Sequence, residues 1–145
     1  MVHIRDEGSR FDGSIETVRR YTNMPELHGK AHASYRNLEV KPEGGAAITL
    51  TMERNWMGSW VKVSNRVTLL PPLGTVNEHL AGPFAGSKMF TVYPPEDIDY
   101  TRVDVYGEFR SPTLPEAQIE AAVRHWLEEA YNEDAPAIKA FHKPL

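Results

Sequence analysis

The 145-residue chain contains no cysteine. This absence excludes disulfide bonds, thiolate metal sites and cysteine nucleophiles, and nothing in the composition indicates an oxidising compartment. An excess of positive charge is also missing, because 16 lysines and arginines stand against 20 aspartates and glutamates, for a formal net charge of −4 at pH 7. Nucleic-acid-binding domains usually carry a basic face or stripe. We therefore expect no nucleic-acid partner.

Long hydrophobic runs are missing as well. No segment approaches the ~20 consecutive apolar residues that a membrane-spanning helix needs. Residues 1–7 carry several charges and lack the apolar segment of a signal peptide. We therefore expect a cytoplasmic protein with no membrane span. The length suits a single domain over residues 1–145, large enough to bury a core without disulfides or metals.

Sequence motifs for cofactors and metals are absent too. The chain has no glycine-rich phosphate loop, no GxSxG and no HExxH motif, so we expect no cofactor. His28 and His32 have the i, i+4 spacing that can bring two imidazoles to one metal ion. Gly29 should end the helix between them, and no carboxylate follows at a useful offset. We therefore expect no metal site.

The hydrophobic pattern changes its period at Pro115. Between residues 33 and 110 apolar residues alternate with polar ones, which is typical of strands. After Pro115 they recur at i, i+3, i+4 and i+7, which is typical of an amphipathic helix. Pro136 should kink this last helix or end it near Asn132. The expected elements are a strand at 3–11, short helices at 15–23 and 26–28, strands at 32–42, 46–56, 60–70, 75–80, 87–93 and 100–109, and a helix at 115–141.

This order of elements predicts an α+β protein. It is accompanied by the turn Gly82-Pro83-Phe84-Ala85-Gly86 and by the segment Tyr131-Asn132-Glu133-Asp134 in the last helix. Together these features resemble the helix-grip fold of the START-like or Bet v 1-like (SRPBCC) superfamily, which includes polyketide cyclase/dehydrase-type proteins. The resemblance implies a curved antiparallel sheet of six to seven strands around a long C-terminal helix, with two short helices after the first strand.

The resemblance extends to the acidic pair late in the last helix. A pair of this kind is similar to one in the catalytic domains of ring-hydroxylating oxygenases, which share the fold. Those oxygenases also carry a cysteine-containing cluster domain, so the lack of cysteine excludes an intact oxygenase α-subunit. Proteins of this fold vary widely in activity, and the fold alone does not define the function.

A curved sheet that grips one helix commonly leaves a gap between them, and an apolar, aromatic-lined gap is a ligand site. On strand 60–70, Asn65 shares the apolar face with its valines. Core packing with no ligand is the alternative to a ligand-binding cavity. The candidate ligand-binding residues are Met52, Trp56, Trp60, Met89, Tyr93, Phe109 and Trp126.

Three residues are candidates for proton transfer. Asp134 falls on the apolar stripe of the last helix, where burial would raise its pKa and suit it to acid–base chemistry. Alternatively, it caps a helix that restarts at Pro136, or it pairs with an arginine of the sheet. His79 titrates nearest neutrality, and Tyr106 can hold a carbonyl oxygen; an exposed histidine and a packed tyrosine are the alternatives.

These observations leave three functions open. The preferred one is the binding of a hydrophobic or aromatic small molecule in the internal cavity. The second is a cofactor-independent cyclase or dehydratase that acts on a polyketide-like or aromatic substrate through His79, Tyr106 and Asp134. The third is a partner-binding domain with a vestigial cavity. The oligomeric state is not indicated by the sequence.

Overall fold

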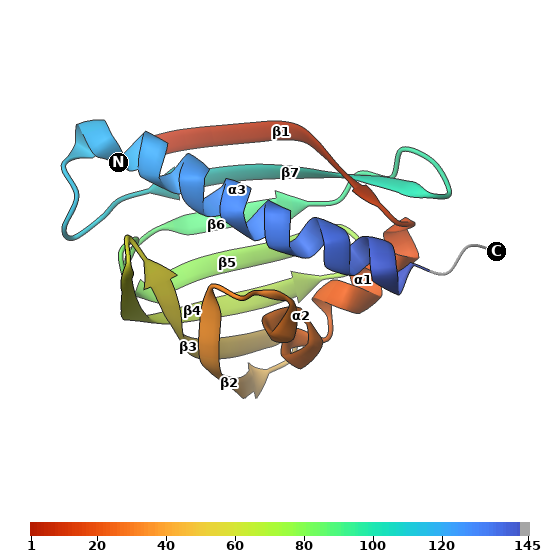
Figure 1. Ribbon diagram of the computed structural model, residues 1–145, viewed down its shortest axis with the longest axis horizontal. Helices are drawn as coiled ribbons and strands as arrows, with labels where there is room; N and C mark the ends of the chain where they lie inside the picture. The colour runs from red at the N-terminus through yellow and green to blue at the C-terminus, as the bar shows by residue number, and fades with distance from the viewer. Residues whose placement is uncertain (143–145) are drawn as a thin grey trace.

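The computed structural model describes residues 1–142 and, within them, the side chains of all residues except 27–29. Seven strands and three helices follow one another along this part of the chain (Figure 1). The elements are β1 (Val2–Asp12), α1 (Ile15–Thr22), α2 (Pro25–Ala31), β2 (Tyr35–Gly44), β3 (Ala47–Trp56), β4 (Ser59–Leu70), β5 (Gly74–Ala81), β6 (Lys88–Val92), β7 (Tyr100–Phe109) and α3 (Glu116–Phe141).

The strands form one antiparallel sheet in the order β1-β7-β6-β5-β4-β3-β2. Strands β2 to β7 are a meander, and β1 pairs with β7, so the first and last strands of the chain are neighbours. The sheet curves around α3, which crosses its inner face, while α1 and α2 lie near the C-terminal half of α3 (Figure 1). This arrangement confirms the predicted α+β helix-grip architecture, with seven strands and two short helices after the first strand.

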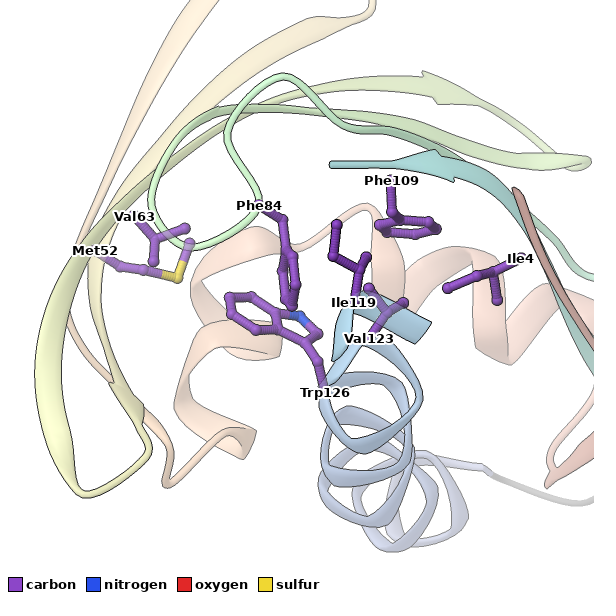
Figure 2. Close-up of a cluster of buried hydrophobic side chains, with 8 residues drawn as sticks. All are labelled: Ile4, Met52, Val63, Phe84, Phe109, Ile119, Val123 and Trp126. Carbon is purple, nitrogen blue, oxygen red and sulfur yellow. The ribbon is translucent and has the colours of Figure 1, made fainter. Parts of the chain in front are cut away.

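The long helix α3 packs on the sheet through two separate groups of buried side chains. Beneath its N-terminal half, the larger core cluster joins the helix to residues of four strands, β1, β3, β4 and β7, and of the β5–β6 turn (Figure 2). Its buried members are Ile4, Met52, Val63, Phe84, Phe109, Ile119, Val123 and Trp126. Beneath its C-terminal half, the smaller core cluster consists of Phe11, Val18, Tyr21 and Ile138.

The short helix α1 belongs to the smaller core cluster because of its local sequence. Ser14 caps the helix, since its hydroxyl accepts a hydrogen bond from the Thr17 amide at 3.1 Å. Val18 and Tyr21, three residues apart, then lie on one side of the helix and are both buried. The α1 helix thereby closes the end of the sheet that the N-terminal half of α3 does not cover.

The expected end of the second short helix at residue 28 is wrong, whereas α3 reaches Phe141 as expected. Of the two alternatives at Pro136, the early end near Asn132 does not occur. An internal proline costs about 3 kcal/mol, and burial of Ile138 in the smaller core cluster offsets much of this cost. The α2 helix likewise continues past Gly29 to Ala31, since a glycine inside a helix costs only about 1 kcal/mol relative to alanine.

Within residues 1–142, none of the helices is both long enough and apolar enough to cross a membrane.

Candidate ligand-binding cavity

A cavity of about 200 Å³ lies between the sheet and the middle of α3. It separates the two core clusters, because Met52 and Trp126 of the larger cluster and Phe11 of the smaller cluster all contribute to its wall. The helix α3 contributes one side of this wall through Trp126, Leu127, Ala130, Tyr131 and Asp134. Most of the opposite side consists of the inner face of the sheet.

Strand β5 presents polar side chains to this cavity and apolar ones to the outside. Thr75, Asn77 and His79 line the cavity, whereas Leu80 is exposed on the outer surface. Polar residues of the neighbouring strands β4 and β6 also line the cavity. We call the set the inner polar stripe, and its members are Asn65 of β4, Thr75, Asn77 and His79 of β5, and Thr91 of β6.

The strand register brings the members of this stripe together. Asn65 lies directly opposite His79, and Asn77 lies opposite Val67, in the antiparallel pair of β4 and β5. The register of that pair shifts next to Asn65, so one extra residue of β5, Leu80, is accommodated there. Such a bulge re-aims neighbouring side chains.

The two asparagines of the stripe carry unpaired groups. Among the described residues, the Oδ1 atoms of Asn65 and Asn77 are buried and have no hydrogen-bond partner. Asn65 as a whole is 7% exposed. A buried polar atom without a partner typically costs about 1–3 kcal/mol. A bound molecule can therefore supply the hydrogen-bond partners that the fold does not provide for these two amide oxygens.

His79 is neutral at physiological pH. Burial first, and the positive charge of Arg54 second, lower the pKa of His79 to about 4. Its ring lies edge-on among aromatic side chains, with the Trp126 ring centroid at 6.0 Å and the Phe84 centroid at 6.3 Å. A neutral imidazole has one nitrogen that donates and one that accepts a hydrogen bond.

The cation that acts on His79 is itself buried behind the cavity wall. Arg54 is 1% exposed, and its guanidinium carbon lies 3.6 Å from the centroid of the Trp126 ring. One terminal nitrogen donates to the Tyr35 hydroxyl at 2.9 Å and the other to Glu129 at 3.1 Å. These contacts fix Trp126, and with it the side of the cavity that α3 forms.

A second group of charged residues joins α3 to the segment between α2 and β2. His32 Nδ1 lies 2.8 Å from Glu133 Oε1, and His32 Nε2 lies 2.8 Å from Asp134 Oδ1. Glu133 also accepts hydrogen bonds from the Ser34 amide and hydroxyl, and Asp134 accepts one from the Tyr21 hydroxyl at 2.8 Å. We call this group, His32, Ser34, Glu133, Asp134 and Tyr21, the acidic clamp.

The pKa directions in the acidic clamp follow from these contacts. Burial acts to lower the pKa of His32, but hydrogen bonds and charges from Asp134 and Glu133 outweigh it, so the pKa is raised. Burial acts to raise the pKa of Glu133, but hydrogen bonds from Ser34 and His32 prevail, so the pKa is lowered. A protonated imidazole donates from both nitrogens and therefore matches two carboxylates.

Among the described residues, neither of the structural roles considered as alternatives is found for Asp134. The α3 helix is continuous around it, so Asp134 caps no new helix. The buried arginine of the sheet, Arg54, pairs with Glu129 instead. Asp134 lines the cavity, with His32 and Tyr21 as its partners in the acidic clamp.

Six of the ten candidate residues line the cavity, and four do not. Those that line it are Met52, His79, Met89, Tyr93, Trp126 and Asp134. Trp56 and Phe109 pack in the larger core cluster beside it. Trp60 and Tyr106 lie on the outer face of the sheet, because Val61 and Val105, their neighbours in sequence, point inward. Trp60 packs there under Arg36, whose guanidinium carbon is 4.1 Å from the ring centroid.

Several residues of the site were not predicted as site residues. Arg54 keeps the two-residue period of Ile48, Leu50 and Met52, so the alternation of β3 was a signal for its inward position. His32 carried no comparable signal, since its role depends on residues about one hundred positions away in α3. Tyr35 carried none either, because its role depends on the hydrogen bond from Arg54 and on stacking with the His32 ring at 4.5 Å.

Among the described residues, no three histidine or carboxylate side chains are grouped so as to hold a metal ion. The side chain of His28, one half of the histidine pair considered above, lies outside the described residues.

Comparison with solved structures gives the same architecture over nearly the whole chain. A START superfamily protein from Mycobacterium smegmatis matches with a TM-score of 0.77 at 13% identity, covering 95% of this chain and 97% of that chain. The Zhui aromatase/cyclase from Streptomyces sp. R1128 matches with a TM-score of 0.75 at 12% identity, covering 96% and 92%. Norcoclaurine synthase from Thalictrum flavum, solved in complex with dopamine and hydroxybenzaldehyde, matches with a TM-score of 0.69 at 14% identity, covering 99% and 89%.

No protein-family model matches the chain, and no curated protein matches it in sequence. At 11–18% identity, the structural matches define the fold alone. The chain thus has the helix-grip fold of the START and Bet v 1 proteins, with a partly polar cavity between sheet and helix.

Proposed function

We propose that this protein binds a small aromatic or other apolar molecule in the cavity between the sheet and α3. The observation that carries the proposal is the cavity itself, about 200 Å³ in volume and lined by Met52, Met89 and Trp126. An apolar cavity of about 150 Å³ accommodates benzene. The volume thus suits one ring with substituents or two fused rings.

The lining chemistry supports the same conclusion. Methionine and tryptophan side chains adapt to, and pack against, flat apolar ligands. Polar groups of the inner polar stripe supply the few orienting hydrogen bonds that ligand pockets usually contain. The fold is also that of norcoclaurine synthase, whose structure holds dopamine and hydroxybenzaldehyde. The single-domain organisation and the cytoplasmic location stay predictions.

The proposal is tested with a ligand search and a blocked cavity. Native mass spectrometry of freshly purified protein should detect a co-purified small molecule, and equilibrium dialysis should measure saturable binding of naphthalene. Val67→Phe fills the cavity from β4 and should abolish naphthalene binding. Thr68→Phe, on the opposite face of the same strand, is the matched control and should bind like the wild type. Absence of saturable naphthalene binding to the wild type would refute the proposal.

A cofactor-independent enzyme of the cyclase or dehydratase type is the second candidate. The observation in its favour is that a neutral His79 and the carboxylate of Asp134 both border the cavity. Loss of a general acid or base typically costs ~10²- to 10⁴-fold in rate. In a turnover assay with a polyketide-like substrate, His79→Gln and Asp134→Asn should show this loss. Tyr106→Phe, on the outer face, should keep the full rate.

A further inference from the structure

The inner polar stripe goes beyond what the binding of an apolar ring requires. A purely apolar ligand would provide no hydrogen-bond partner for the buried Oδ1 atoms of Asn65 and Asn77. We propose that this stripe recognises the hydroxyl group of a neutral aromatic ligand and discriminates against carboxylates. The inference rests on the proposed function and names the chemistry of its ligand.

The first argument is geometric. Asn65 and His79 lie directly opposite each other in the β4–β5 pair. Asn77 precedes His79 by two residues and lies on the same side of β5. Three polar side chains are therefore neighbours on the sheet side of the cavity, where the His79 ring meets the edge of Trp126, the residue that supplies the aromatic surface. A ring that packs on Trp126 can direct a substituent at the stripe.

The second argument concerns hydrogen-bonding capacity. A hydroxyl group can donate one hydrogen bond and accept another, while an ether only accepts. The side-chain amide of asparagine rotates easily about its last torsion, so either its oxygen or its nitrogen can turn toward a ligand. A ligand hydroxyl can therefore donate to an unpaired amide oxygen and accept from an amide N–H or from the His79 ring.

The third argument concerns charge. Among the described residues that line the cavity, none is a lysine or an arginine, and two, Asp6 and Asp134, are acidic. The lining also includes His32, but its two ring nitrogens already lie 2.8 Å from Glu133 and Asp134. Arg54, buried behind the wall, donates from its terminal nitrogens to Tyr35 and Glu129. A ligand carboxylate would lose its hydration and would have to compete with these carboxylates for a cationic partner, which is unfavourable.

The experiment compares four compounds that share one ring system. Equilibrium dialysis with the 145-residue protein measures its affinities for naphthalene, 2-naphthol, 2-methoxynaphthalene and 2-naphthoate. We expect 2-naphthol to bind about tenfold more tightly than 2-methoxynaphthalene, as one additional buried hydrogen bond implies. We expect 2-naphthoate to bind most weakly.

Variants then assign the preference to the stripe. Asn65→Leu and Asn77→Leu should bring the ratio of the 2-naphthol to the 2-methoxynaphthalene affinity close to one, while the affinity for naphthalene stays or rises. Asn55→Leu, an exposed asparagine of β3, should leave the ratio unchanged. Thermal unfolding of each variant reports whether it folds, and the comparison of the four compounds on the wild type does not depend on the variants.

Each outcome separates the two proposals. If naphthalene binds but 2-naphthol binds no more tightly than 2-methoxynaphthalene, the inference is wrong and the proposed function stands. Tightest binding of 2-naphthoate has the same consequence. If none of the four compounds binds, the proposed function and the inference are both overturned.

Discussion

Arg54 is the buried charge that acts on the side chains of the cavity wall. It is buried beneath Trp126, it bonds Tyr35 and Glu129, and it contributes to the low pKa of His79. Its Nε atom has no partner among the described residues, so its burial is only partly compensated. A buried guanidinium of this kind is costly unless it is paired.

Replacing Arg54 with methionine should change two measurable quantities. The pKa of His79 should rise above 4, because one of the two causes that lower it is removed, but it should stay below 6.5 because burial remains. The free energy of unfolding should fall by about 2 kcal/mol, since the Tyr35 hydroxyl loses its partner while the half-exposed Glu129 can be rehydrated. NMR titration of the histidine side chain and chemical denaturation measure the two effects.

Arg36 supplies the control for this variant. Its side chain is half exposed on the outer face, where it pairs with Glu53. Arg36→Met should therefore change stability by no more than about 1 kcal/mol and leave His79 unaffected. A His79 pKa that is the same in Arg54→Met and in the wild type would contradict the electrostatic role of Arg54.

At the scale of elements, the acidic clamp fixes the C-terminal half of α3 to the segment that follows α2. The raised pKa of His32 means that its charge stabilises the fold fully below pH 6.5, and that this contribution is lost as pH rises through the pKa of the folded state. The lowered pKa of Glu133 means that its contribution is present above pH 4.5 and is lost as pH falls through its own folded-state pKa. The clamp is therefore strongest between about pH 4.5 and 6.5.

His32→Asn should destabilise the protein most within this window. We expect a loss of about 2–3 kcal/mol near pH 5.5, because two carboxylates then face each other without the imidazolium, and a smaller loss at pH 9. Chemical denaturation of the variant and the wild type at both pH values measures the difference in the free energy of unfolding. The titration of His79 contributes equally to both proteins and therefore cancels in this difference. His125→Asn, a highly exposed histidine of α3, is the control. An equal loss at both pH values would show that His32 acts by packing alone.

At the scale of the whole molecule, the packed core and the proposed binding cavity lie in different places. The two core clusters lie at either end of α3, and the cavity lies between them. Ile119, 3% exposed in the larger core cluster, contributes to packing and does not line the cavity.

Ile119→Ala should therefore lower the free energy of unfolding by about 2–4 kcal/mol, as truncation in a close-packed core does. The affinity of the folded variant for naphthalene should stay within about twofold of the wild type. Thermal unfolding measures the loss of stability, and equilibrium dialysis measures the affinity for naphthalene. Val67→Phe is the comparison variant, because it should abolish naphthalene binding. The separation fails if Ile119→Ala weakens binding as strongly as Val67→Phe does.

The sequence alone determined the fold, because the features that define it are local. The change of period at Pro115, the alternation along β3 and β4, and the turn signals between strands each depend on residues within a few positions of one another. The same local alternation placed Met52 and Asn65 on the inner face of the sheet. The helical period after Pro115 was likewise sufficient to predict the packing of Trp126 against that face.

The orientation of β5, in contrast, was decided only by the tertiary structure. Local hydrophobicity favours burial of Val76 and Leu80, yet register and the bulge turn Asn77 and His79 inward. Likewise, the partners of the acidic clamp are about one hundred residues apart in the chain, and Tyr106 falls outside the cavity because Val105 faces it. Which face of a strand is buried, and which distant carboxylate meets which histidine, depend on the register of the whole sheet, and no local period encodes that register.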